Sequence, residues 1–363
     1  PKLGLRAASF LVISVIIGSG VFKKIAPMAQ ELGTPWLILL CWLIAGIVSL
    51  AGALCTAELV SMYPNSGGEY NYFQKIYGRF FSFLYGWASF AVIKTAAISA
   101  LAYIFAQSLN SLFPLPVLDS DITFLGLHLF ENLSIKLLAA LLILLLTLLN
   151  YRGVQFAEKL SSVLTYAMLA AIAFFLVVGL GSDKGSMTHL TTNANGFNTD
   201  LNGWTLMKAL FLASLGAFWG YDGWNNIAFI GEEIKNPKRN IGLSLFLGTL
   251  IVTVIYISAN LMYLSVLPLN EIANAPADRV AVAASNVIFG NIGTYVIAVM
   301  IMISTFGCNN GLILAGARVY YTMAKDGLFF KKAGTLNKHA VPAWALWAQC
   351  IVAGLLCLSG RYG

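Results

Sequence analysis

Charge is scarce in this sequence. Only 10% of its 363 residues are charged, whereas soluble globular domains carry about 25%. Hydrophobic residues make up 59% of the chain, and the mean hydropathy is +0.79. No half of the chain is polar enough to form a separate soluble domain. The composition therefore excludes an ordinary soluble protein and indicates an all-α, multi-pass membrane protein.

Side chains typical of catalytic and metal sites are also few. The three histidines, His128, His189 and His339, lie in loops without metal-ligand spacing, and all five cysteines lie in apolar segments. No G-x-S-x-G, H-E-x-x-H or phosphate-binding loop pattern occurs. We therefore expect no enzyme activity, no cofactor and no metal site. Any transport activity would be secondary, because no ATP-binding loop is present.

Blocks of like charge are absent as well, so the net charge of +7 does not predict a nucleic-acid partner. Lys and Arg fall mostly in one of two alternating sets of loops, the set that includes the N-terminus. By the positive-inside rule, this pattern predicts a cytoplasmic N-terminus in a plasma or inner cell membrane. The bilayer is then the main partner of the chain.

Long apolar segments are what the sequence has in abundance, and we predict that they form nine spanning helices. These run over 5–31, 35–62, 79–108, 135–152, 157–182, 204–231, 239–267, 283–323 and 342–358. Nine helices from a cytoplasmic start would leave the C-terminus outside. Because the sequence stops directly after the ninth segment, we expect a fragment truncated before later helices.

Two of these segments contain helix-breaking residues near their centres. "VIIGSGVF" (15–22) interrupts the first segment, and "GAFWGYDGWNN" (216–226) interrupts the sixth. Non-helical backbone at membrane depth survives only where it lines a protein cavity, and paired broken helices indicate a transporter binding site. Their spacing fits a five-plus-five inverted repeat, with 1–182 as the first repeat and 204–363 as an incomplete second.

Broken helices expose backbone groups that suit a zwitterion. N–H groups of Gly18, Ser19 and Gly20 would favour a carboxylate, and freed carbonyls would favour an ammonium group. The alternative is that the glycines only allow close helix packing. Trp219 beside the second break is either a lid over a ligand or an ordinary core aromatic.

Lys94 is an ionisable residue in the middle of the third segment, which by default suggests a function. It could line the cavity, replace a coupling cation or meet the substrate. Alternatively, it is structural and pairs with Glu58 or Asp222; the sequence does not decide between these roles.

Four stretches resemble a known family. They are "IIGSGVF" (16–22), "AELVSMYPNSGGEYNYF" (57–73), "FWGYDGWNNIAFIGEEIKNPKRN" (218–240) and "NNGLILAGARVYYTMAKDG" (309–327). The chain resembles the amino acid–polyamine–organocation superfamily, in particular bacterial relatives of the L-type amino acid transporters. The resemblance implies a LeuT-like fold that works by alternating access. It also implies carboxylate binding at Ser19 and Gly20, amine binding by carbonyls near Ile16, Trp219 and Asp222, and Trp219 as an aromatic gate.

Three departures from the family pattern affect the expectations. Family members typically have twelve helices, more than this chain supplies. Met168 occupies the helix-5 position where some relatives carry a lysine in place of a sodium ion. Residues 109–134 contain no cysteine, so we expect no disulfide-linked heavy chain.

These observations predict a secondary active transporter of small or neutral amino acids, either an exchanger or a proton-coupled carrier. The alternatives are a transporter of cationic amino acids or polyamines, which Asp222 would favour, and a membrane channel or receptor. Helices 3 and 8 should supply the side-chain pocket, with Phe306 and Gly307 as further candidates. The predicted substrate-binding residues are Ile16, Ile17, Gly18, Ser19, Gly20, Trp219, Gly220, Asp222, Gly223 and Asn310.

Overall fold

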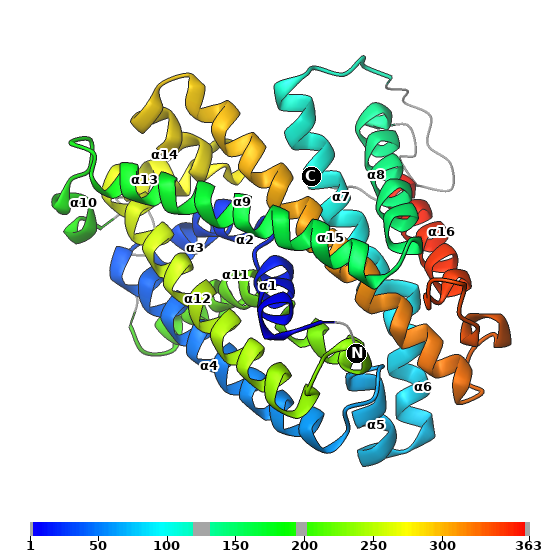
Figure 1. Cartoon of the computed structure of the whole chain (residues 1–363). Helices are drawn as coiled ribbons and strands as arrows, with labels where there is room; N and C mark the ends of the chain where they lie inside the picture. Colours follow the sequence, from blue (N-terminus) through cyan, green and yellow to red (C-terminus); the bar gives the residue numbers. More distant parts are fainter. Residues whose placement is uncertain (1–2, 119–130, 194–201, 360–363) are drawn as a thin grey trace.

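The computed structural model describes residues 3–118, 131–193 and 202–359, and these residues fold almost entirely into helices (Figure 1). Within these ranges, the only pairing of extended backbone is a single parallel bridge between Leu3 and Ile234. The all-α fold class predicted from composition is therefore confirmed.

Among the described residues, seven helical stretches are long and apolar enough to cross a membrane. They are Leu5–Lys23, α4 (Pro35–Met62), Arg79–Leu112, α8 (Leu133–Tyr151), α9 (Val154–Leu180), α12 (Pro237–Val266) and α15 (Ile292–Lys325). The predicted sixth and ninth spans do not meet this measure. The sixth is divided into α11 (Gly203–Tyr221) and the 3₁₀ helix η2 (Trp224–Glu233), and α16 (Ala343–Ser359) has only 17 residues.

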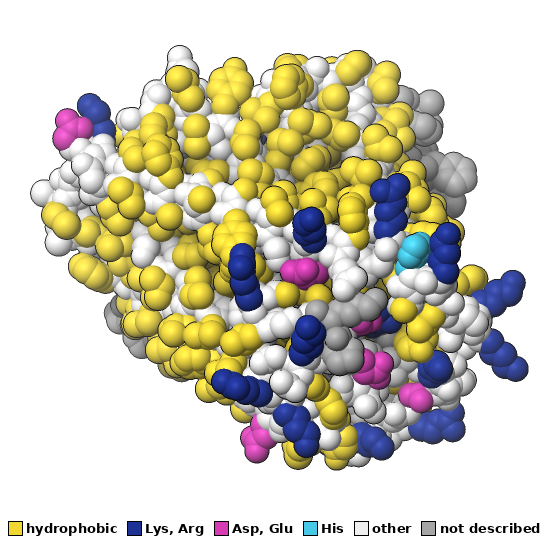
Figure 2. All heavy atoms as spheres, in the orientation of Figure 1, with side chains coloured by type: hydrophobic (Ala, Val, Ile, Leu, Met, Phe, Trp, Pro, Cys, Tyr) yellow, Lys and Arg dark blue, Asp and Glu magenta, His cyan; other side chains and the backbone are white. Residues whose placement is uncertain are grey.

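Apolar side chains cover the outside of the bundle, while many polar ones lie inside it. Large hydrophobic side chains such as Ile47, Val177 and Phe211 are exposed, whereas Asn260 and Asn310 are fully buried. Figure 2 shows a surface that is largely hydrophobic, with Lys and Arg gathered toward the end that holds the N-terminus, α5 (Glu69–Tyr77) and α6 (Arg79–Ala88). This distribution suits a protein whose middle is surrounded by the hydrocarbon core of a bilayer.

The predicted eighth span, 283–323, is wrong as a single helix. The chain forms α14 (Val280–Phe289), turns at Gly290, and begins α15 at Ile292. Gly290 has a φ of +66°, which ends the first helix. The close return of α15 beside α14 depends on Gly293, since a Cβ there would lie 2.4 Å from the Ser285 backbone. The sequence did not predict this turn, because apolar residues continue on both sides of it.

Several short helices outside the spans were also not predicted. They are α5, α10 (Met187–Thr191), α13 (Leu269–Ala273), the 3₁₀ turn η3 (Pro276–Asp278) and the 3₁₀ turn η4 (Lys331–Gly334). The first of these follows the pair Gly67 and Gly68, whose positive φ angles reverse the chain after α4. It packs against the start of α6.

Helices 1 and 6 are broken at the two predicted segments. Helix 1 comprises α1 (Leu5–Ile16), α2 (Gly20–Lys23) and α3 (Ile25–Leu32), and helix 6 comprises α11 and η2. The first break lies in the interior of the bundle, where α1 packs against α9, α12 and α15 (Figure 1). The five-plus-five repeat, with its halves at 1–182 and 204–363, stays a prediction.

Candidate functional site

The two helix breaks touch each other through glycines. A Cβ added to Gly20 would lie only 2.9 Å from the Cα of Gly220. Gly223 adopts a φ of +116°, and a Cβ there would lie 2.7 Å from the Val15 carbonyl oxygen. Neither position has room for a larger residue, so these glycines do allow close packing. They also bring the unwound backbone of both helices to one place.

The first break leaves backbone donors without partners. Within the described residues, no hydrogen bond forms at the N–H groups of Ser19 and Gly20, whereas the Gly18 N–H donates to the Ile16 carbonyl over 2.8 Å. The Ser19 side chain caps nothing. Two adjacent unpaired N–H groups at the start of a helical turn are suited to an anionic oxygen.

Side chains of other helices satisfy the carbonyls freed by the breaks. Ser304 Oγ lies 2.6 Å from the Ile17 carbonyl oxygen and 2.8 Å from that of Gly18. Tyr256 Oη lies 3.0 Å from the carbonyl oxygen of Ile16 and 2.9 Å from that of Gly220. Because a tyrosine hydroxyl has one proton, Tyr256 links the two broken helices through one shared donor.

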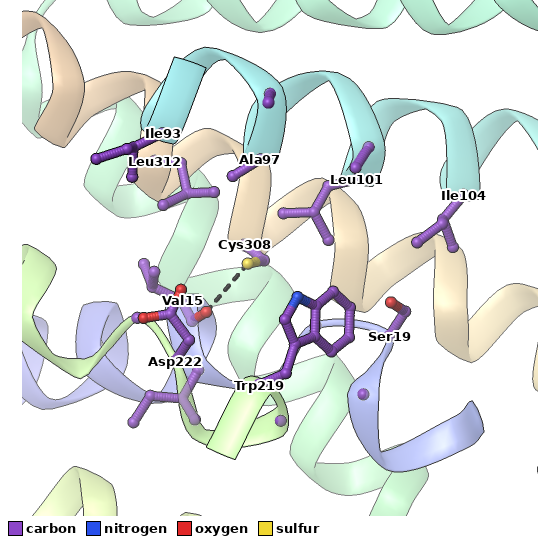
Figure 3. Close-up of a pocket in the computed structure, with 17 residues that line it drawn as sticks. Val15, Ser19, Ile93, Ala97, Leu101, Ile104, Trp219, Asp222, Cys308 and Leu312 are labelled. Atoms are coloured by element: carbon purple, nitrogen blue, oxygen red, sulfur yellow. Dashed lines mark hydrogen bonds between the residues drawn. The ribbon is translucent and has the colours of Figure 1, made fainter. Parts of the chain in front are cut away.

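A cavity of about 360 Å³ lies between the breaks and α7 (Lys94–Leu112) (Figure 3). This volume is within the usual range for small-molecule sites. Eight of the predicted site residues line it: Ile16, Gly18, Ser19, Gly20, Trp219, Gly220, Asp222 and Gly223. The sequence prediction thus identified most of the backbone side of the cavity.

The opposite wall is small and apolar. It is formed by Ile93, Ala96, Ala97, Ala100, Leu101 and Ile104 around α7, together with Cys308 and Leu312 of α15. Figure 3 shows this wall facing Trp219 and Ser19 across the cavity. The Cys308 Sγ donates to the Val15 carbonyl over 3.0 Å, so the thiol also stabilises the end of α1. Helices 3 and 8 therefore form the wall, as expected.

Trp219 and Asp222 are the two distinctive side chains of the second break. Trp219 is half-exposed, and its ring lies 4.4 Å from the Lys24 ammonium and next to Gly20. Asp222 ends α11 and is exposed toward the cavity, and no described cation forms an ion pair with it. An unpaired carboxylate in a cavity whose other side chains are mostly apolar is suited to an ammonium group.

Four predicted candidates lie outside the cavity and need correction. Asn310 hydrogen-bonds Asn150, Ser161 and the Ala157 carbonyl, so it joins helices instead of facing the cavity. Phe306 packs against Phe105. Gly307 packs against Ser14, and Ile17 is fully buried with its carbonyl bound by Ser304. The cavity-facing residues of α15 are Cys308 and Leu312, one turn apart.

Lys94 does not line the cavity and pairs with neither predicted carboxylate. Its Nζ donates to Asn226 Oδ1 over 2.8 Å, and it lies 4.6 Å from the Phe229 ring centroid. Glu58 is exposed on α4, and Asp222 faces the cavity. Met168, at the position of the lysine found in some relatives, belongs to the apolar core.

Sequence reasoning missed several residues of the site. The residues of the α7 wall did carry a signal in the sequence. Apolar residues follow Lys94 at spacings of about one helical turn, a pattern typical of one helix face. Tyr256 and Ser304 carried no signal, because a hydroxyl in a long apolar helix does not show which distant carbonyl it binds.

Comparison with known proteins identifies the family of the chain. The profile of a family described as amino acid permease matches residues 3–362. The serine/threonine exchanger SteT of Bacillus subtilis is 36% identical over 324 residues, which cover 89% of this chain and 68% of that protein. The human b(0,+)-type amino acid transporter 1 is 29% identical, covering 99% of this chain and 70% of the transporter. The mouse large neutral amino acids transporter small subunit 2 is 28% identical, with 99% and 65% covered.

Proposed function

Since the chain belongs to the amino acid permease family, and is thus a membrane transporter of amino acids and not an enzyme, we propose that it exchanges small neutral amino acids across a membrane. The observation that carries this proposal is the cavity at the two helix breaks. It presents unpaired N–H groups at Ser19 and Gly20 and a carboxylate at Asp222 to one small space. These groups match the two charged ends of an amino acid.

In this proposal, the substrate carboxylate accepts hydrogen bonds from the Ser19 and Gly20 N–H groups. The ammonium group lies beside Asp222 and the carbonyls at the ends of α1 and α11. The side chain then points to the alanine-lined face of α7, where an apolar group is buried at no desolvation cost and a small hydroxyl at far less cost than a charge. Trp219 acts as the gate over the occupied site.

The apolar wall formed by α7 and α15 favours small neutral substrates. It offers methyl groups, a thiol and branched aliphatic chains, but no charged group that could pair with a charged substrate side chain. The relative named as a serine/threonine exchanger also suggests small substrates and exchange. We further propose that the N-terminus is cytoplasmic and that the protein resides in the cell membrane, because Lys and Arg favour the loops on that side.

The test is uptake of labelled alanine or serine into proteoliposomes. Vesicles loaded with unlabelled amino acid should accumulate label much faster than empty vesicles. Equal uptake into both would contradict exchange, and stimulation of empty vesicles by an inward pH gradient would identify proton coupling instead. Flux that does not saturate with concentration would indicate a channel.

Asp222 supports one alternative, transport of a cationic amino acid or polyamine. If its carboxylate pairs with a substrate side chain, labelled arginine or spermidine will compete better than alanine. Competition by the twenty amino acids and spermidine against labelled alanine separates the two. The neutral proposal predicts that arginine and spermidine compete poorly.

A further inference from the structure

Two irregular helical segments lie next to the cavity, one ending at the cavity-lining Ile93 and the other beginning directly after the cavity-lining Gly223. Helix 3 contains a π-helical turn, η1 (Ser89–Ile93), and the second half of helix 6 is η2, whose 3₁₀ turns are interrupted by a kink at Ile230. Such segments inside long helices often mark hinges or functional sites. The Thr95 hydroxyl donates to the Phe90 carbonyl, five residues back, over 3.0 Å and so supports the wider turn.

One buried hydrogen bond joins these segments. Lys94 is the first residue after η1, and its ammonium donates to Asn226 near the start of η2. Lys94 is only 6% exposed, and Asn226 is 4% exposed. A buried ammonium is costly unless it is hydrogen-bonded and electrostatically compensated, so this contact strongly favours one position of η2 relative to helix 3.

Further hydrogen bonds connect the surroundings of the Lys94–Asn226 contact to the cavity on one side and to Glu69 on the other. Toward the cavity, Asn226 Nδ2 donates to the Gly223 carbonyl over 2.8 Å. Away from it, Asn225 hydrogen-bonds the Glu69 carboxylate, which also accepts from Tyr85. The cavity backbone at Gly223 is thus connected through Asn226 to the buried Lys94 ammonium, and Asn226 also donates to Asn225, which hydrogen-bonds Glu69.

We propose that Lys94 and Asn226 are a positioning pair for transport: their contact holds η2 against helix 3, and its breaking and re-forming accompanies the movement of η2 when the site changes sides. This inference rests on the proposed exchange function. Because Lys94 does not line the cavity, the pair acts on the rate of the conformational step and not on substrate contacts.

The experiment is a double-mutant cycle on exchange in loaded proteoliposomes. Lys94→Met and Asn226→Leu, which nearly preserve side-chain volume, each remove the contact. Each should lower the maximal exchange rate by about tenfold, equivalent to about 1.4 kcal/mol, while the half-saturating concentration changes by less than about twofold. The double variant should be no slower than Asn226→Leu, the single variant that also loses the bond to the Gly223 carbonyl, since both substitutions remove the same contact.

Lys208→Met is the matched control, because Lys208 is exposed on α11 of the same helix 6. It should exchange at the wild-type rate. Glu69→Gln keeps the size of the side chain but removes its charge and one of the two oxygens that accept from Tyr85 and Asn225. It should slow exchange as well, because Asn225, the neighbour of Asn226, is then held less firmly.

Three results would overturn the proposal. In the first, the fold reductions in exchange rate caused by Lys94→Met and Asn226→Leu multiply in the double variant, since this indicates independent roles. Another is a large rise in the half-saturating concentration at an unchanged maximal rate, since this makes Lys94 a substrate contact. The third is an equal loss of thermal stability and of rate in every variant, including Glu69→Gln, since this makes the network only structural. Absence of exchange in the wild type would instead contradict the proposed function.

Discussion

Gly20 and Gly220 approach so closely that a single methyl group on Gly20 would lie 2.9 Å from the Gly220 Cα. One residue opens the second part of helix 1, and the other lies two residues before the unwound segment of helix 6. Their contact explains why both breaks are rich in glycine: the unwound backbones must meet to enclose one cavity between them.

Gly20→Ala should therefore weaken substrate binding. Its methyl group would push α2 away from α11 and move the Ser19 and Gly20 N–H groups off the carboxylate position. We expect affinity to fall by about tenfold or more, equivalent to at least 1.4 kcal/mol. Binding measured by competition against labelled alanine checks this, and Gly20→Leu should abolish binding. Gly4→Ala is the matched control, because a Cβ at Gly4 meets nothing; wild-type affinity in Gly20→Leu would contradict the placement.

Tyr256→Phe removes the hydroxyl shared by the carbonyls of Ile16 and Gly220. The Ile16 carbonyl keeps the Gly18 N–H, but the Gly220 carbonyl loses the donor described for it, and a buried carbonyl without a donor costs about 1–3 kcal/mol. The breaks should hold their relative positions less well, so both affinity and exchange rate should fall. Tyr263→Phe on the same helix is the matched control, since no described hydrogen bond forms at its hydroxyl. Equal behaviour of the two variants would show that the Tyr256 bridge is unimportant.

Asp222→Asn tests the proposed ammonium position. The variant retains the size of the side chain but loses the charge that attracts the ammonium group. Alanine affinity should fall by about tenfold or more. A selective loss of arginine binding with alanine binding unchanged would support the cationic alternative instead.

Ala100→Leu should narrow the cavity at the α7 wall. Added volume in a small apolar pocket excludes larger side chains first, at about 1–3 kcal/mol per misfit group. Glycine and alanine should still bind, while leucine and methionine compete less well than they do with the wild type. The same loss for every amino acid would show that this face does not contact the substrate side chain.

Glu233→Gln tests a buried ion pair at the end of η2. Arg318 of α15 is 4% exposed and forms an ion pair with Glu233. Removing the carboxylate leaves a buried cation, which typically costs about 3–5 kcal/mol. The variant should unfold at a clearly lower temperature in detergent. Arg318→Met with Glu233→Gln should recover much of the loss; no recovery would mean that the charge imbalance is not the cause.

Much of the backbone side of the site could be predicted from the sequence, because unwound backbone inside an apolar run is tolerated only where it lines a cavity. The expectation that helices 3 and 8 supply the wall came from the transporter interpretation and not from the breaks. Asn310 of helix 8 does not line the cavity. It is polar for a reason that only packing reveals: it accepts from Asn150 and donates to Ser161.

The turn at Gly290 and the partner of Lys94 were beyond sequence reasoning for different reasons. Apolar residues continue on both sides of Gly290, so hydropathy does not change where the helix ends. The partner of Lys94 is an uncharged amide 132 residues away. Charge pairing suggested only carboxylates, and a long-range hydrogen bond leaves no pattern in the local sequence.

The most direct test of the two-break site compares three ligands that differ only in their charged ends. Alanine, ethylamine and propionate are each titrated against labelled alanine in proteoliposomes. If the unwound backbone at Ser19 and Gly20 binds the carboxylate while Asp222 binds the ammonium group, alanine will compete at least about a hundredfold better than either partial ligand. Equal competition by ethylamine or by propionate would contradict a site that requires both ends.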